Sequence, residues 1–296
     1  MNVESTDLVI LGHIAKDIIS VDRKSFDSLG GAVYYGGLAG SHMGLKITII
    51  TRLNEADFEL LNVFKKNGIA YYAYPSEQTS GLKNIYSSTN MEFREYRPLG
   101  FAGLFKKEEI PEINTKFFVI SPIIVGEIDL ELLKYIKKKY PGKLCLDIQG
   151  FIRFRNESKV FYSSLSLEEK KEILSDVQVL KLDQIEAEIL IKQDSIVNAA
   201  KELLTFGPKE ILITFQKGIS VFTSKNSYFF PWKNNSSVGR TGRGDTAFIS
   251  YLGSRITKNI EQSLKFAAAL TSLKLEHPGP FNLPLHLVKD LIKKEY

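Results

Sequence analysis

Short apolar segments alternate with segments of helical periodicity along most of the chain, and this alternation restricts the fold more than any other feature. The first part predicts strand, helix, strand, helix and strand in turn at residues 7–14, 30–45, 46–53, 55–68 and 69–75. Further strands are expected at 116–123, 143–149, 177–182 and 209–215, with helices near 128–139, 184–192 and 195–206. Strands that alternate with helices pair in parallel, so we expect a three-layer α/β fold whose mostly parallel central sheet carries helices on both faces.

Residues 81–98 interrupt this alternation. Their sequence alternates polar and apolar residues about a turn-forming SSTN, which predicts a β-hairpin. A hairpin inserted into an α/β unit suggests a lid, and residues 18–29 can supply a further lid strand. The sequence contains no internal repeat and no low-complexity linker, so residues 1–296 are expected to form a single domain with this small β lid.

Composition narrows the choice of ligand and of cellular compartment. The net charge of +5 comes from scattered lysines rather than a basic block, which favours phosphorylated metabolites over nucleic acid as ligands. The single cysteine, Cys145, allows neither a disulfide within the chain nor a cysteine metal site. The first residues lack a signal-peptide pattern, and no apolar run approaches the ~20 residues that span a bilayer. We therefore expect a cytoplasmic protein without a membrane partner.

The segment TGRGDTAFISYLGSR, residues 241–255, surrounds Asp245 with glycine and arginine where a helix is expected to begin at about Gly244. Glycine lets backbone N–H groups approach one point, and the unpaired N–H groups of a first helical turn add positive potential. This predicts an anion site for a phosphate. A carboxylate at its edge is well placed to take a proton from a hydroxyl that attacks the phosphate. The alternative is that Asp245 only caps the helix.

Together with GGAVYYGGLAGSHMG at residues 30–44, this segment resembles the two signatures of the ribokinase-like (PfkB) carbohydrate kinase family. In the first signature, the strand end LGHIAKD supplies Gly12 and Asp17, and the glycine pair is Gly30 and Gly31. The second signature is a GAGD-like segment, which here reads GRGD and ends at Asp245. The order and spacing of the motifs agree over nearly the whole chain.

Two further family elements are matched imperfectly. In the N-x-x-E element, Asp183 stands in place of the asparagine and Glu186 keeps the glutamate. Of the T-x-G-x-x-G element only Thr214 and Gly218 remain, with one residue missing and one glycine lost. The added negative charge could alter the affinity for a metal, and the altered loop leaves the phosphoryl donor open between ATP and another compound.

The resemblance implies ATP-dependent phosphoryl transfer to a hydroxyl of a small sugar or polyol. Asp245 would be the catalytic base, and the backbone N–H groups of Gly242, Arg243 and Gly244 would hold the transferring group. Mg²⁺ would be held, through water, by Glu186 together with Asp183. The nucleotide would lie beside Thr214 and Gly218. The alternative for Glu186 is a solvated helix residue that binds no metal.

The resemblance also implies an acceptor site. The Asp17 carboxylate and the Gly30–Gly31 turn would bind substrate hydroxyls, unless Asp17 is only a turn residue at a strand end. The family's usual asparagine is replaced by Tyr35, so ribose is not the default acceptor. The stretch LDIQGFIR puts Gln149 and Arg153 after a strand's carboxyl end, where α/β sheets bind ligands. Similar stretches occur in archaeal and plant members related to inositol kinases. The alternative is that these residues only tie down a loop.

Two other functions remain open at this point. The chain could phosphorylate a nucleoside, as some members of the family do, or it could be a non-catalytic ligand-binding protein that kept the fold. In the lid hairpin, Arg94, Tyr96 and Arg97 could close over the substrate. An exposed lid edge could also pair with a second copy of the chain to form a homodimer.

Overall fold

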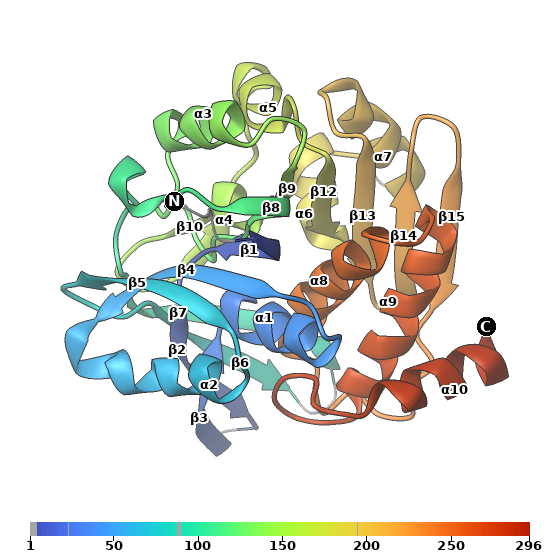
Figure 1. Cartoon of the computed structure of the whole chain (residues 1–296), viewed down its shortest axis with the longest axis horizontal. Helices are drawn as coiled ribbons and strands as arrows, with labels where there is room; N and C mark the ends of the chain where they lie inside the picture. The colour runs from blue at the N-terminus through green and yellow to red at the C-terminus, as the bar shows by residue number, and fades with distance from the viewer. Residues whose placement is uncertain (1–4, 23, 88–89, 194) are drawn as a thin grey trace.

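The computed structural model describes residues 5–22, 24–87, 90–193 and 195–296, with the side chains of residues 90–94 outside the description. A nine-stranded sheet runs through the molecule in the order β15-β14-β13-β12-β9-β8-β1-β4-β5 (Figure 1). Its strands are β1 (Ser5–Leu11), β4 (Ile47–Asn54), β5 (Ala70–Ser76), β8 (Asn114–Ile120), β9 (Leu144–Asp147), β12 (Val179–Asp183), β13 (Glu210–Phe215), β14 (Gly218–Phe222) and β15 (Ser227–Pro231). The neighbours β13–β14 and β14–β15 pair antiparallel, and the other neighbours pair in parallel.

Helices cover both faces of this sheet, as Figure 1 shows. One face carries α1 (Ala32–His42), α2 (Asn62–Lys66), α8 (Arg243–Arg255) and α9 (Ile260–Leu275), with α10 (Leu285–Glu295) packed on α9. The other carries α3 (Leu130–Lys139), α4 (Gln149–Ile152), α5 (Leu167–Leu174), α6 (Gln184–Ile191) and α7 (Ile196–Thr205). In β1, the side chains of Leu8 and Ile10 pack in the core on the face that carries α1 and α8. Those of Val9 and Leu11 pack in the core on the opposite face, which carries α3 to α7. The predicted three-layer α/β fold is confirmed.

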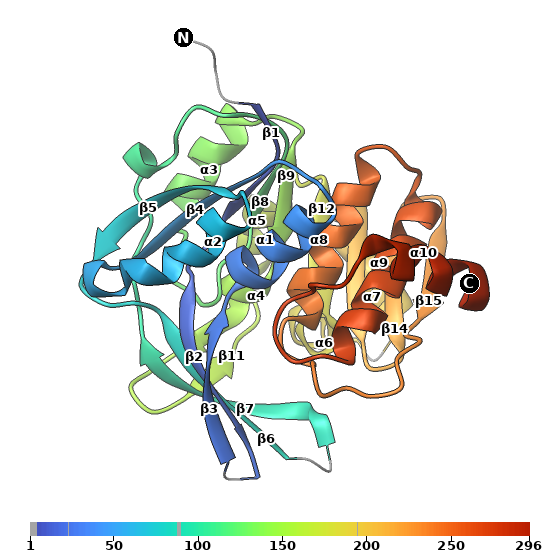
Figure 2. The same cartoon turned by 60° about the horizontal axis from the view of Figure 1, so that its bottom comes forward.

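A second, four-stranded sheet projects from the carboxyl ends of the central strands (Figure 2). It has the order β3-β2-β6-β7 and consists of β2 (Ala15–Val21), β3 (Lys24–Gly30), β6 (Gly81–Ser87) and β7 (Asn90–Gly100). These strands cover the ranges 18–29 and 81–98 that the sequence analysis assigned to a lid. Beside them lies a short hairpin of β10 (Arg153–Arg155) and β11 (Val160–Tyr162). That the whole chain acts as a single domain with a closing lid stays a prediction.

Three segments differ from the sequence-based expectation. Residues 55–68 form a 3₁₀ helix, η1 (Glu55–Leu61), and then the short helix α2, instead of one continuous helix. Only Leu61 and Phe64 are fully buried there, so an apolar stripe long enough to hold a regular helix is missing. Helix α5 was not anticipated, and neither was the 3₁₀ turn η2 (Lys107–Glu109).

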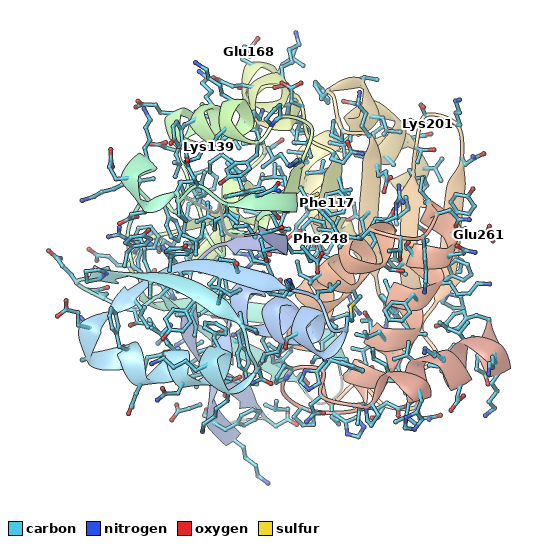
Figure 3. The ribbon with its side chains drawn as sticks, in the orientation of Figure 1. Phe117, Lys139, Glu168, Lys201, Phe248 and Glu261 are labelled. Carbon is cyan, nitrogen blue, oxygen red and sulfur yellow. The ribbon has the colours of Figure 1, made fainter. Side chains whose placement is uncertain are left out.

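Charged side chains lie mostly at the surface and apolar side chains form the core, as expected for a folded globular chain. Figure 3 shows Glu168 and Lys201 at the rim of the molecule, whereas Phe248 of α8 lies inside and is fully buried. Cys145 is also buried. Among the described helices, none combines the length and the apolar composition that crossing a bilayer requires.

Candidate active site

A small cavity of about 70 Å³ lies where α8 begins, between the carboxyl ends of the central strands and the lid. Most of the residues selected from the sequence line it, namely Asp17, Gly31, Gln149, Arg153, Asp183, Thr214, Gly242, Arg243, Gly244 and Asp245. Tyr35, Tyr96 and Arg240 also line it. The lining further includes residues that the sequence did not assign to the site, namely Leu82, Asn84, Ile123, Lys181 and Thr241. Segments far apart in the sequence thus meet at one edge of the sheet, as expected for an open α/β fold.

The start of α8 has the geometry of an anion site. Gly242 is the N-cap residue in a left-handed conformation, with φ of 80°, and α8 follows from Arg243. The Arg243 N–H donates to the Arg240 carbonyl at 3.2 Å, which closes a turn. Within the described part of the chain, no hydrogen bond occupies the backbone N–H groups of Gly242 or Gly244. Those two groups, with the positive end of the helix dipole, can receive an anion.

Asp245 lies in the first turn of α8 and lines the cavity. Close packing of α1 on α8 fixes its position. A Cβ at Gly36 of α1 would lie 3.3 Å from the Asp245 carbonyl oxygen and would overlap Ile249. Glycine is therefore required in α1 for the two helices to approach each other this closely. The carboxylate can accept a proton from a hydroxyl bound in the cavity.

Lys181 brings a buried positive charge to the other side of the anion site. Its Nζ lies 3.0 and 3.1 Å from the two carboxylate oxygens of Asp147 and 3.8 Å from Glu186. Burial alone would lower the pKa of Lys181, but Asp147 and Glu186 outweigh it and hold the pKa above its usual value. A Cβ at Gly244 would lie only 3.2 Å from this Nζ. Sequence reasoning missed Lys181, although a lone lysine in an apolar strand was a usable signal.

Arg153 both ties down a loop and faces the cavity. It is 3% exposed, and its guanidinium donates to Gln149 Oε1 at 2.7 Å and to the Tyr162 hydroxyl at 3.2 Å. The Tyr96 ring of the lid lies 4.8 Å from the guanidinium carbon, in cation–π geometry. The two interpretations of this stretch, contact with a substrate and attachment of a loop, are therefore compatible. The structure places Gln149 and Arg153 in the cavity wall, and their contact with a substrate stays a prediction.

Asp183 and Glu186 form a capping box at the start of α6. Glu186 N–H donates to Asp183 Oδ1 at 2.8 Å, and Asp183 N–H donates to Glu186 Oε2 at 2.7 Å. Glu186 is 1% exposed and so is not a solvated helix residue. Burial, followed by the neighbouring Asp183, raises the pKa of the Glu186 carboxyl to about 7.

The same pair is the predicted magnesium site. Glu186 Oε1 is buried and makes no hydrogen bond to the described residues, and the Asp183 side chain lines the cavity. No cluster of three acidic, histidine or cysteine side chains suited to direct coordination occurs among the residues that the structure describes. These carboxylates therefore fit Mg²⁺ held through water better than a direct cage. The magnesium site stays a prediction.

The acceptor side of the cavity is formed by the lid and the start of α1. Asp17 lies within β2 rather than at a turn, and its Oδ1 accepts the Leu82 N–H at 2.8 Å. A Cβ at Gly30 would overlap the Asp17 carboxylate, so this position needs glycine. Gly31, with φ of 87°, lines the cavity, whereas Gly30 lies behind Asp17. Asp17 therefore presents a fixed carboxylate to the cavity.

The predicted nucleotide side is only partly brought to the cavity. Thr214 lines it, but Gly218 does not and instead packs against Phe229 and Phe230. Strands β13 and β14 are joined by only two residues, 216 and 217, where the family element T-x-G-x-x-G would need a longer loop. Trp232 covers this side, since its Nε1 donates to the Phe215 carbonyl at 2.9 Å. The Arg243 guanidinium lies over the Trp232 ring at 5.9 Å.

The lid contacts the anion site directly. The Tyr86 hydroxyl lies 3.1 Å from Thr241 Oγ1, just before Gly242. Of the lid residues selected from the sequence, Tyr96 lines the cavity, whereas Arg97 is exposed and pairs with Glu95 at 3.4 Å. The side chain of Arg94 lies outside the described residues.

Comparisons with known proteins agree with this geometry. A solved pyrophosphate-dependent kinase of the ribokinase family, in complex with sulfate, is 31% identical and superposes with a TM-score of 0.87 over 96% of this chain and 99% of its own. The chain belongs to the ribokinase family. A pyrophosphate-dependent kinase of the same family, bound to a pyrophosphate analogue and myo-inositol, is 30% identical, with a TM-score of 0.85 over 96% of this chain and 98% of its own.

A curated relative points to a second class of acceptor. A cytidine kinase from Thermococcus kodakarensis is 27% identical over 251 residues, which are 81% of this chain and 84% of that protein. No protein-family model matches the chain. Membership of the ribokinase family makes this chain a kinase, and its reaction is phosphoryl transfer to a sugar or nucleoside.

Proposed function

We propose that this kinase transfers a phosphoryl group from pyrophosphate to a hydroxyl of a small polyol or sugar, with Asp245 as the general base. The observation that carries the proposal is the charge of the cavity wall. Four cationic side chains line it, those of Arg153, Lys181, Arg240 and Arg243, beside the carboxylates of Asp17, Asp183 and Asp245. The cations can hold the phosphates of a donor, and the carboxylates can take the hydroxyls of an acceptor.

The surroundings of the donor side support pyrophosphate as the donor. The short β13–β14 turn and the Trp232 ring stand where the sequence analysis expected a nucleotide. The two solved relatives at 30 and 31% identity are both pyrophosphate-dependent. We therefore favour pyrophosphate over the ATP that the family resemblance alone suggested.

A cyclic polyol such as myo-inositol is the acceptor that we favour. Asp17 can accept hydrogen bonds from a diol, and Asn84 and Gln149 supply further polar groups on the cavity wall. One of the pyrophosphate-dependent relatives was solved with myo-inositol bound. The cytidine kinase relative makes a nucleoside the second candidate.

The reaction would proceed as a single in-line displacement. The acceptor oxygen forms a bond to the transferred phosphorus as the bond from that phosphorus to the bridging oxygen breaks. The acceptor proton passes to Asp245, and inorganic phosphate leaves. The N–H groups of Gly242 and Gly244 would stabilise the charge on the transferred group, with the side chains of Lys181 and Arg243. Mg²⁺ held through water by Asp183 and Glu186 would neutralise further charge on the phosphates.

A panel of donors and acceptors tests the proposal. Pyrophosphate and ATP would each be tried with myo-inositol, ribose, fructose and cytidine, in the presence of Mg²⁺, and the phosphorylated product would be measured. We expect the highest kcat/KM with pyrophosphate and myo-inositol. Turnover with ATP but not with pyrophosphate would contradict the proposed donor. Phosphorylation of cytidine but of no other acceptor would contradict the proposed polyol and favour the nucleoside candidate.

The role of Asp245 has its own test. Because a general base contributes about 10²–10⁴-fold to a rate, Asp245→Asn should lower kcat by that factor. The amide has nearly the same shape, so the melting temperature and the pyrophosphate affinity should stay close to those of the unaltered protein. Asp290→Asn in α10 is the control, because that residue lies outside the cavity. Unchanged turnover in Asp245→Asn would remove this residue from the mechanism.

A further inference from the structure

Lys274 is a buried cation behind the anion site that the proposed reaction leaves unused. It lies in α9 and is 1% exposed. Its Nζ donates to the carbonyl oxygens of Gly239 and Thr241, the second at 2.5 Å. Among the described residues, no carboxylate forms an ion pair with it. Burial of an ammonium group without an opposite charge costs folding free energy. The presence of Lys274 at this place therefore suggests a role for its charge.

The two carbonyls belong to the loop that leads into the anion site. The Thr241 carbonyl and the Gly242 N–H are the two ends of one peptide unit. Because a trans peptide is planar, its C=O and its N–H point in opposite directions. The end bound by Lys274 therefore faces α9, and the N–H end faces the other way, where Gly242 lines the cavity. A positive charge on the carbonyl oxygen strengthens the N–H as a donor to an anion.

Attachment of the loop to α9 does not by itself require this lysine. The Gly239 N–H already donates to the Leu275 carbonyl at 2.8 Å. The loop also packs so closely on the end of α9 that a Cβ at Gly239 would overlap the His277 carbonyl. What Lys274 adds to these backbone contacts is its charge.

We propose that the Lys274 ammonium is a positioning residue for phosphoryl transfer, which orients and polarises the peptide between Thr241 and Gly242 so that its N–H is ready to bind the transferred phosphoryl group. The inference rests on the proposed function, because it takes this cavity as the place of transfer. It assigns to α9 a part in catalysis that does not involve contact with the substrate.

The charged and titratable groups around Lys274 come from three neighbouring elements. Arg240 lies in the loop, Asp245 in α8 and the Tyr35 ring in α1, 5.2 Å from Nζ. Burial, and then Arg240, lowers the pKa of Lys274 to about 7, while Asp245 acts in the opposite direction. A phosphate in the cavity adds negative charge, so it favours the ammonium form.

The test compares variants of two lysines in the same helix. Lys274→Met removes the charge from a side chain of similar length, and Lys265→Met is the matched control, because Lys265 lies over the Phe230 ring and not at the loop. We expect Lys274→Met to lower kcat at least tenfold, with the acceptor KM within about twofold of the unaltered value. Calorimetry with pyrophosphate, which needs no turnover, should show at least fivefold weaker binding. Unchanged kcat and unchanged pyrophosphate affinity in Lys274→Met would overturn the proposal.

A second variant separates charge from packing. Lys274→Ala leaves room for a small cation, so ammonium chloride should restore at least part of the lost kcat and pyrophosphate affinity. Tetramethylammonium chloride at the same ionic strength should not, because that ion has no N–H group to donate. If ammonium chloride restored neither the kcat nor the pyrophosphate affinity of Lys274→Ala, the proposal would be overturned. An unaltered protein that binds pyrophosphate but phosphorylates no acceptor would instead contradict the proposed function, and the calorimetry would still decide the role of Lys274.

The unaltered protein offers a measurement that does not depend on whether the variants fold. The loss of kcat/KM with rising pH, as Lys274 gives up its proton, should follow the pKa of Lys274, and pyrophosphate affinity measured by calorimetry should fall over the same pH range. A loss of kcat/KM at high pH with no change in pyrophosphate affinity would assign the loss to a different group and overturn the proposal.

Discussion

At the scale of single residues, the anion site depends on a backbone conformation that only glycine adopts without strain. Gly242 has φ of 80°, and an added Cβ there would overlap the Tyr35 ring. Gly44, at the end of α1, has the same φ of 80°, but nothing lies within 4 Å of an added Cβ. The left-handed conformation costs an L-residue roughly 1–2 kcal/mol. Substitutions at the two positions can therefore separate the effect of backbone strain from the effect of contact with Tyr35.

Alanine at each position tests this difference. Gly44→Ala should lower the free energy of unfolding by about 1 kcal/mol and leave kcat unchanged, because only backbone strain is added. Gly242→Ala should cost about 1–3 kcal/mol more, because the Tyr35 ring must move, and it should lower kcat at least tenfold. Urea unfolding and steady-state kinetics measure both effects. Equal losses of stability and equal kcat in the two variants would show that Tyr35 does not support the site.

At the scale of helices and strands, the site depends on how two helices and the lid meet at the start of α8. Helix α1 supports α8 through Gly36, and the lid contacts the preceding loop through Tyr86 and Thr241. The apolar contact of the lid is small, since only Ala15, Leu82 and Tyr96 of the lid are buried there, against Ile123 and Ile124 of the segment that follows β8. Single polar contacts between the lid and the site should therefore have measurable effects.

Removal of the Tyr86 hydroxyl tests the contact between the lid and the anion site. One hydrogen bond contributes a net ~1 kcal/mol, so Tyr86→Phe should lower kcat/KM about fivefold. The free energy of unfolding should fall by no more than about 1 kcal/mol, because the ring remains in place. Arg97→Ala is the matched lid control, since Arg97 is exposed and pairs only with its neighbour Glu95 among the described residues. If both variants had the same kcat/KM as the unaltered protein, the Tyr86–Thr241 contact would have no part in the reaction.

The elements that the sequence predicted are those whose signals are local. The start of α8 was predictable because Gly242, Gly244 and Asp245 are neighbours in the chain. Helix α5 also had a local signal that was not used, since Ser166 and Glu169 form a capping box. The interrupted helix at 55–68 was not predictable, because its hydrophobic residues follow a helical pattern and only packing shows how few are buried.

The cations of the site were harder to predict than its glycines. Lys181 and Lys274 lie in a central strand and in a helix, more than 90 residues apart, and only the tertiary fold brings both to the start of α8. Lys181 had a usable signal, since it is a lone lysine in an apolar strand, but nothing in the sequence of α9 marks Lys274 as buried, because most lysines of a soluble protein are solvated. On the donor side, Thr214 lines the cavity and Gly218 does not, and the binding of a nucleotide beside them stays a prediction.

At the scale of the whole molecule, a buried polar cluster joins the lid to the central sheet. His13 and Glu127 are fully buried, and His13 Nδ1 lies 2.8 Å from Ser80 Oγ. The Glu127 carboxylate accepts the N–H groups of His13, Ile123 and Ile124 at 3.1, 2.6 and 3.0 Å. His13 and Ser80 directly precede the segments that enter β2 and β6. The protonation of this cluster is therefore coupled to the stability of the fold.

The pH dependence of stability follows from the two pKa shifts in this cluster. Burial lowers the pKa of His13 to about 3, from 6.5, so stability is lost as the pH falls from about 6.5 towards 3. Burial raises the pKa of Glu127 from 4.5 to about 8, so stability is lost as the pH rises from about 4.5 towards 8. Between about 4.5 and 6.5 the two slopes oppose each other. We expect the contribution of this cluster to the free energy of unfolding to be nearly constant in that window and to fall on either side of it.

Urea unfolding at pH 5.5, 6.5 and 8 tests this expectation. Of this cluster, only Glu127 contributes between pH 6.5 and 8, and it should lower stability by at most about 1.4 kcal/mol per pH unit. Glu186 and Lys274, whose pKa values also lie near 7, contribute equally to the unaltered protein and to Glu127→Gln, so the difference between the two proteins is the quantity to measure. Glu127→Gln cannot ionise, so it should abolish this alkaline decline even if the amide lowers stability at every pH. Glu131→Gln is the control, because Glu131 is an exposed residue of α3 and pairs with Lys107. An alkaline decline in Glu127→Gln as steep as that of the unaltered protein would assign the decline to a different group, and would remove Glu127 from the coupling between pH and fold.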